Sequence, residues 1–166
     1  MIALNDPVPD AVLTETLEFG EACPLNPKNV SVAEAAKGKR IVVFGLPGAY
    51  TPTCSAKHVP GYLAAYDQLR HHKVDEVWCV SVNDAYVMAA WGKEQKALGK
   101  IRMLGDGNAE FARKLGLEDD KSKSGMGTRI KRFSMLLDNG VVKQLNLEAP
   151  GKFEVSDAAT MLKQLG

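Results

Sequence analysis

One stretch of the chain constrains the fold more than any other: a short apolar run, a proline-bounded turn and a cysteine. Residues 40–46, which are uncharged and mostly apolar from Ile41 onward, are predicted to form a buried strand. Thr51 then suits a helix N-cap, and Pro52 suits the first helical position, where its missing N–H costs nothing. We therefore expect Cys54 in the first turn of a helix that begins directly after a buried strand.

This expected position of Cys54 favours a reactive thiolate. Backbone N–H groups in the first helical turn have no partners within the helix, and the helix dipole adds partial positive charge there. An ordinary cysteine thiol, with a pKa of ~8.5, is mostly protonated at neutral pH, so stabilisation of the thiolate means activation. Most free cysteines are small, buried apolar residues. The strand, the turn and the helix start together indicate a nucleophile instead.

Three segments resemble those of one known family. Residues 47–54, Pro-x-x-x-Thr-x-x-Cys, are similar to the peroxidatic-cysteine motif of the peroxiredoxins. With VSVND (80–84) and GTRIKRFSM (127–135), they resemble the type II, or peroxiredoxin-five, subfamily. The resemblance implies a thiol-dependent peroxidase, an antioxidant enzyme that reduces hydrogen peroxide and alkyl hydroperoxides, with peroxynitrite as a further candidate. A Cys54 thiolate would attack the peroxide and become a sulfenic acid.

Three further residues are predicted to act with Cys54. Thr51, one helical turn earlier, can hydrogen-bond the thiolate and the peroxide, and Pro47 shields the sulfur from water. A strand antiparallel to the parallel ones begins at the rim where Cys54 lies, so Arg129 or Arg132 can reach it. The family pattern selects Arg132, whose charge would stabilise both the thiolate and the departing oxygen.

The sulfenic acid must be reduced again, and the other cysteines leave the route open. Cys79, in a predicted buried strand, is either a packed core thiol or a resolving partner that requires the first helical turn to unwind. A cysteine there resembles plant-like type II members, whereas Ser156 stands where animal-like relatives carry a resolving cysteine. An external reductant is therefore expected, glutathione with glutaredoxin first and thioredoxin second. Cys23 has no predicted role.

The rest of the pattern predicts an α/β chain with a thioredoxin-like fold. The expected order is strand–helix–strand–helix–strand–helix, then a hairpin with an Asn-Gly turn and a last helix. This order makes a central mixed sheet flanked by helices, with an insertion and an N-terminal extension, in one redoxin domain over residues 1–166. An edge strand or hairpin is expected over residues 11–19, and loops are expected over 21–30 and 117–128. Helix N-caps are predicted at Ser31, Asn108 and Ser156.

The helix that follows Cys54 contains a proline and is followed by a group of histidines. Pro60 is expected to kink the helix, because it removes one backbone hydrogen bond. His71 and His72 are neighbours that point in different directions, and nothing completes a metal site, so the histidines are interpreted as a solvated helix end. His58 is expected to point away from the Cys54 pocket. Neither a metal nor a bound cofactor is expected.

Composition excludes several classes of function. The 166 residues carry a net charge of +1, which makes no electrostatic case for nucleic acid or an anionic membrane. No apolar run approaches the length of a membrane span. Three cysteines argue for a reducing compartment. The N-terminus lacks a secretory signal, so a cytoplasmic location is expected, although a removed organelle transit peptide would leave no trace.

Three other functions, and the formation of a homodimer, are also considered from the sequence. A thioredoxin-like oxidoreductase would need Cys-x-x-Cys, but Thr51 and Lys57 occupy the positions three residues from Cys54. A cysteine hydrolase would need a histidine beside Cys54. A non-enzymatic redox sensor or a chaperone-like assembly on the same fold stays open, and either would differ by lacking turnover with a reductant. Type II relatives resemble dimers with an interface beside the active-site loop, so the candidate homodimer contacts are Tyr50, Pro52 and Trp91.

Overall fold

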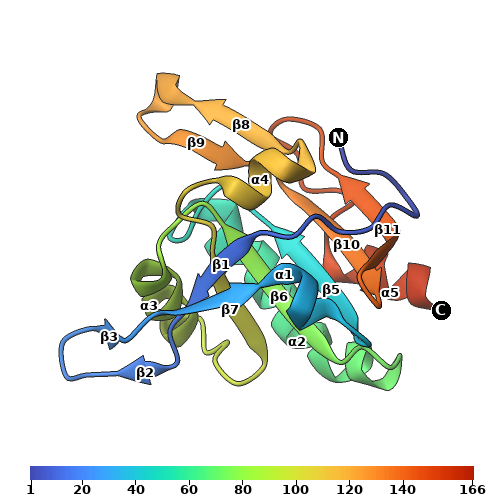
Figure 1. The fold of residues 1–166 in the computed structure, drawn as a ribbon, viewed down its shortest axis with the longest axis horizontal. Coiled ribbons are helices and arrows are strands. Elements are labelled where there is room, and N and C mark those ends of the chain that lie inside the picture. Colours follow the sequence, from blue (N-terminus) through green and yellow to red (C-terminus); the bar gives the residue numbers. More distant parts are fainter.

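The computed structural model describes residues 1–166, arranged around one seven-stranded mixed sheet (Figure 1). The strands, in spatial order, are β11 (Val141–Leu147), β10 (Phe133–Asp138), β5 (Arg40–Gly45), β6 (Glu76–Ser81), β7 (Ile101–Gly105), β1 (Val12–Glu15) and β4 (Lys28–Ser31). β5, β6 and β7 are parallel, and β10 runs antiparallel beside β5. The end of β5 and the beginning of β10 therefore lie at the same rim.

Helices cover both faces of this sheet. They are α1 (Val32–Ala36), α2 (Val59–His71), α3 (Ala85–Glu94), α4 (Glu110–Leu115) and α5 (Ala158–Leu165). Alternate residues of β5 point to opposite faces, so Ile41 and Val43 pack in the cluster that includes α1 and α4, whereas Val42 and Phe44 pack with α2, α3 and α5. This arrangement confirms the predicted thioredoxin-like α/β fold. None of the helices has the length and apolar character needed to cross a membrane.

Several short strands lie where loops were predicted. Residues 21–30 contain β3 (Pro24–Leu25) and the start of β4, and residues 117–128 contain β8 (Glu118–Lys121), a short 3₁₀ turn, η2 (Ser122–Ser124), and the first half of β9 (Gly127–Ile130). β3 pairs with β2 (Glu18–Phe19), and the two small hairpins project from opposite ends of the molecule (Figure 1). β2 and β3 are two residues long and so too short to show an alternating pattern. In the β8–β9 hairpin the residues are mostly polar, and Ile130 is the one side chain that is buried in the core. β1 lies inside the sheet, between β7 and β4, and so is not an edge strand.

Of the helix caps predicted at Ser31, Asn108 and Ser156, the last two were wrong by one or two residues. Ser31 does cap α1, but α4 is capped by Asp106 rather than Asn108, with two first-turn N–H groups donating to its carboxylate at 3.1 and 2.9 Å. α5 is capped by Asp157 rather than by Ser156. A neighbouring carboxylate competes successfully for the N-terminal N–H groups in both helices.

Candidate active site

The predicted helix start is present, and Cys54 lies in its first turn. The chain is helical from Pro52, and Cys54–His58 form a π-helical turn, η1, that continues into α2. Pro60 has no N–H to donate to the carbonyl four residues earlier. The wide turn, closed by the Val59 N–H on the Cys54 carbonyl, directly precedes this missing bond and accommodates it. The Cys54 side chain is fully buried here.

Of the two arginines that the topology left open, Arg132 is the one beside the sulfur. It immediately precedes β10, and its Nη2 donates to Cys54 Sγ at 3.1 Å. Arg129 instead donates from Nη1 to the Pro47 carbonyl at 3.1 Å and from Nε to the Met126 carbonyl at 2.9 Å. Arg129 therefore braces the turn before the helix, whereas Arg132 places a cation at the thiol.

The prediction for His58 was wrong. Its side chain is fully buried, with Nδ1 2.8 Å from Nη1 of Arg132 and Nε2 3.1 Å from the Ser156 carbonyl oxygen. Burial, and then the charge of Arg132, lower the pKa of His58 to about 3. The prediction overlooked that residues four apart share a helix face, so His58 lies on the same side as Cys54. That spacing was the signal that could have found it.

The turn before the helix is held by its own polar groups. The Thr51 hydroxyl donates to the Gly48 carbonyl at 2.7 Å, so it closes this turn and does not form the predicted N-cap bond. The Ala49 N–H donates to Asn83 Oδ1 at 3.0 Å, which ties the turn to the segment after β6. Tyr50 adopts a left-handed φ of 63°. The resulting geometry brings Thr51 and Pro47 to the wall of one cavity.

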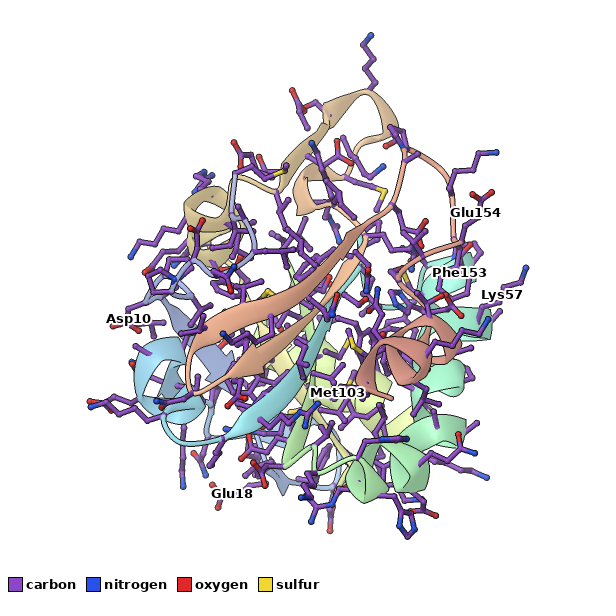
Figure 2. The ribbon with its side chains drawn as sticks, turned by 90° about the vertical axis from the view of Figure 1, so that its right-hand side faces the viewer. Asp10, Glu18, Lys57, Met103, Phe153 and Glu154 are labelled. Atoms are coloured by element: carbon purple, nitrogen blue, oxygen red, sulfur yellow. The ribbon has the colours of Figure 1, made fainter.

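That cavity, of about 600 Å³, opens above Arg132. Its lining residues come from the turn, from the β8–β9 hairpin and from the segment after β11: Pro47, Thr51, Pro52, Thr53, Asp119, Lys121, Met126, Lys131, Arg132 and 147–153. The guanidinium of Arg132 lies over the Phe153 ring, with Cζ 5.8 Å from the ring centroid, and the Phe153 and His58 ring centroids are 5.0 Å apart. Figure 2 shows Phe153 beside the helix that carries Lys57. The turn before the helix and the segment after β11 therefore form separate parts of the cavity lining.

The segment after β11 is anchored by one carboxylate. Glu148 accepts hydrogen bonds from the backbone N–H groups of Glu154, Val155 and Ser156, and from the Ser156 hydroxyl at 2.7 Å. Burial acts to raise the pKa of Glu148, but these hydrogen bonds outweigh it and the net shift is downward. The Glu148 N–H also donates to the Arg132 carbonyl at 3.0 Å. Glu148 therefore links the segment after β11 to the backbone of Arg132.

The three cysteines have different environments, and none is in a disulfide. Cys79 is fully buried within β6, and it packs in the same apolar cluster as Cys54. Burial, followed by the proximity of Cys54, raises the pKa of Cys79 well above its usual value. Cys23 is exposed, between β2 and β3. No group of three or more His, Cys, Asp or Glu side chains is placed to hold a metal ion.

The structure supports only part of the predicted contact surface. Tyr50 is 50% exposed and Pro52 is also exposed. Trp91, however, is fully buried and donates from its indole N–H to the Ser55 hydroxyl at 3.0 Å. Trp91 offers no surface to a second chain, so its proposal as a contact was wrong. The apolar run of α3, read from sequence, does not distinguish a buried tryptophan from an exposed one.

In a comparison with known proteins, residues 3–162 of the chain match the Redoxin family. The chain is 47% identical to peroxiredoxin-2E-2, chloroplastic, of Oryza sativa subsp. japonica, over 99% of this chain and 72% of that protein. It is 43% identical to peroxiredoxin-2C of Arabidopsis thaliana, over 99% and 98% of the two chains. The crystal structure of reduced Prx3 from Vibrio vulnificus in complex with H₂O₂ is similar at a TM-score of 0.92 and 46% identity, with both chains fully covered.

The chain therefore belongs to the peroxiredoxin family, and the relatives confirm the predicted type II resemblance. It is a thiol-dependent peroxidase, an oxidoreductase that reduces peroxides at the expense of thiols.

Proposed function

We propose that Cys54 is the peroxidatic residue and that Arg132, Thr51 and Pro47 complete its site. The observation that carries this proposal is the 3.1 Å contact of Arg132 Nη2 with a sulfur buried at the start of a helix. The thiolate attacks the nearer peroxide oxygen, so that an S–O bond forms as the O–O bond breaks. The sulfur is oxidised to a sulfenic acid, and the departing oxygen takes up a proton to leave as water or an alcohol.

Each neighbour has a distinct part in this step. The Arg132 guanidinium carries donors fixed in a planar fork, which stabilise the thiolate and then the charge on the departing oxygen. The Thr51 hydroxyl already donates to Gly48, so it offers its lone pairs to the O–H of the peroxide. Pro47, with its carbonyl held by Arg129, limits the access of water to the sulfur.

The proposed substrates are hydrogen peroxide and alkyl hydroperoxides, with peroxynitrite as a further candidate. The similar Vibrio protein is described with H₂O₂, and a cavity of about 600 Å³ has room for an organic chain as well. The proposed reductant is external, glutathione with glutaredoxin first and thioredoxin second. Burial of Cys79 supports this choice, as does Ser156, a buried hydroxyl where a resolving thiol would be needed.

We further propose one redoxin domain over residues 1–166, a homodimer that uses Tyr50 and Pro52, and a cytoplasmic location. The last follows from three unpaired cysteines, which indicate a reducing compartment. A redox sensor on the same fold is the alternative, because a sulfenic acid at Cys54 would also serve as a signal.

Peroxide consumption with each reductant system tests the proposal. Wild type, Cys54→Ser and Cys79→Ser are compared with glutathione plus glutaredoxin and with thioredoxin plus its reductase. We expect turnover by wild type and Cys79→Ser, and none by Cys54→Ser. Loss of turnover in folded Cys79→Ser would make Cys79 the resolving thiol. Oxidation of wild type that neither system reverses would favour the sensor.

A further inference from the structure

We infer that His58 is a positioning residue: its imidazole holds the Arg132 guanidinium in the orientation that reaches the sulfur of Cys54. The inference rests on the proposed role of Cys54. It starts from the two contacts of one guanidinium, Nη1 with His58 Nδ1 at 2.8 Å and Nη2 with Cys54 Sγ at 3.1 Å. Because the guanidinium is planar and rigid, fixing one Nη sets the direction of the other.

The direction of the proton follows from the partners of His58. The Ser156 carbonyl can only accept, so Nε2 of His58 carries the hydrogen and donates to it at 3.1 Å. Nδ1 of a neutral imidazole then has a lone pair, and it accepts from Nη1 of Arg132. An imidazolium would have no lone pair and would repel the guanidinium. His58 therefore acts as a neutral acceptor.

The surroundings keep His58 in this state. Burial and the charge of Arg132 lower its pKa, and they outweigh the opposing effects of the Ser156 carbonyl, Glu148 and Asp157. The Ser156 carbonyl is fixed in place by a second donor, the Tyr62 hydroxyl at 2.8 Å. Glu148 holds the N–H and the hydroxyl of the same serine. The loop after β11 thus sets the tautomer of the histidine.

A neutral acceptor has a particular advantage at this position. Arg132 takes part in none of the ion pairs in the structure. A carboxylate at the place of His58 would orient the guanidinium equally well, but it would cancel much of the charge that stabilises the thiolate. The imidazole orients Arg132 and leaves its charge for Cys54 and the peroxide. The guanidinium also lies over the Phe153 ring, which adds a neutral aromatic neighbour and no compensating charge.

Substitutions at His58 separate this role from a merely structural one. In His58→Asn, the amide oxygen can occupy the place of Nδ1 and accept from Arg132, whereas His58→Leu removes the acceptor. His71→Leu, on the exposed end of the same helix, is the control. Measurements are the rate of Cys54 oxidation by hydrogen peroxide in a single turnover, the thiolate absorbance at neutral pH, and the urea midpoint of unfolding.

For His58→Leu we expect a rate lower by on the order of 10- to 100-fold and a smaller thiolate fraction, as a misplaced reacting group costs about this much. His58→Asn should recover most of the rate, and His71→Leu should match wild type. The decisive comparison is His58→Leu in an Arg132→Gln background. If His58 acts through Arg132, it should have little further effect there.

Three results would overturn the inference: an unchanged rate in folded His58→Leu, no recovery in His58→Asn, or an equal loss in both backgrounds. Failure of the proposed function looks different, because wild-type Cys54 itself would then fail to react with peroxide. The urea midpoints show whether any variant is simply unfolded.

Discussion

At the scale of single residues, the site places one uncompensated positive charge against one buried sulfur. Arg132 meets a neutral histidine, an aromatic ring and Cys54, whereas Arg129, three residues earlier, is bound to two backbone carbonyls. The two arginines of the same segment therefore have separable effects, one on the reaction and one on the turn that precedes the helix.

Substituting each arginine by glutamine tests this separation. Arg132→Gln removes the charge at the sulfur and should lower the rate constant for Cys54 oxidation by about 10²- to 10³-fold, the usual loss of one preorganised donor to a developing anion. Arg129→Gln should cost less than about tenfold, because only the bracing of Pro47 is lost. Stopped-flow oxidation of both variants checks the order, and equal losses would contradict it.

His58 also predicts how stability depends on pH. Its pKa is about 3 in the folded chain and about 6.5 when unfolded, so between these values the unfolded state binds more protons. The free energy of unfolding should therefore fall as pH falls, by up to about 1.4 kcal/mol per pH unit from this residue. Between about pH 6.5 and pH 5, above the range of most carboxylates, urea titrations should show a flatter dependence for His58→Asn. His71→Asn should keep the wild-type slope. Identical slopes for His58→Asn and wild type would refute the prediction.

Sequence alone could predict the residues whose position follows from a motif. Cys54 at a helix start and an arginine before an antiparallel strand both follow from the order of strands and turns. The four-residue spacing indicates that His58 lies on the same side as Cys54, but not which groups its ring contacts. Its contact with Arg132 depends on the π-helical turn and on the Ser156 carbonyl, which a distant loop supplies. The burial of Trp91 likewise depends on packing, through its bond to Ser55.

At the scale of elements, the site depends on how β5 and β10 meet at their shared rim. Gly45 ends β5 and pairs with Phe133, the first residue of β10 and the neighbour of Arg132. A Cβ at Gly45 would overlap the Phe133 ring. The missing side chain therefore lets the start of β10, and with it Arg132, lie close above the helix start.

A pair of glycine substitutions tests this packing. Gly45→Ala should destabilise the chain by about 1–3 kcal/mol, the usual cost of overpacking a buried site. Gly61→Ala is the matched control: nothing lies near its new methyl group, and in helix α2 alanine should stabilise by about 0.5–1 kcal/mol. Urea unfolding measures both. A neutral or stabilising Gly45→Ala would show that β10 adjusts freely.

Sequence predicted the elements that carry an apolar signal and missed those that do not. β5, β6 and the β10–β11 hairpin bury continuous or alternating apolar runs, so their patterns were visible. β4, β8 and β9 consist largely of polar or charged residues with exposed faces, and only the pairing of their backbones defines them. The cap of α4 was also missed, because whether Asp106 or Asn108 accepts from the first-turn N–H groups depends on the path of the loop.

At the scale of the whole molecule, the turn before Cys54 presents Tyr50 and Pro52 outward. Tyr50 is half exposed, held in a left-handed conformation, with its hydroxyl 3.2 Å from Glu94. An ordered, exposed aromatic residue of this kind suits a contact between chains. The proposed homodimer would therefore cover the surface next to the active-site turn.

Sedimentation analysis of two charge substitutions tests the proposed dimer. Tyr50→Asp should weaken the dimer by about tenfold or more, the range expected for a central aromatic contact. Leu17→Asp, at a side chain that is 71% exposed between β1 and β2, should leave it unchanged. Wild type that sediments as a monomer, or a dimer that Tyr50→Asp does not affect, would refute the assigned interface.

The proposed function requires that Cys54 is the residue that peroxide oxidises. The most direct measurement is whole-protein mass spectrometry after one equivalent of hydrogen peroxide and a sulfenic-acid trap, on wild type and Cys54→Ser. We expect rapid trapping at Cys54 in wild type and none in Cys54→Ser, with Cys79 and Cys23 unmodified. A Cys54 that stays reduced for minutes at stoichiometric peroxide, or a sulfenic acid trapped elsewhere, would contradict it.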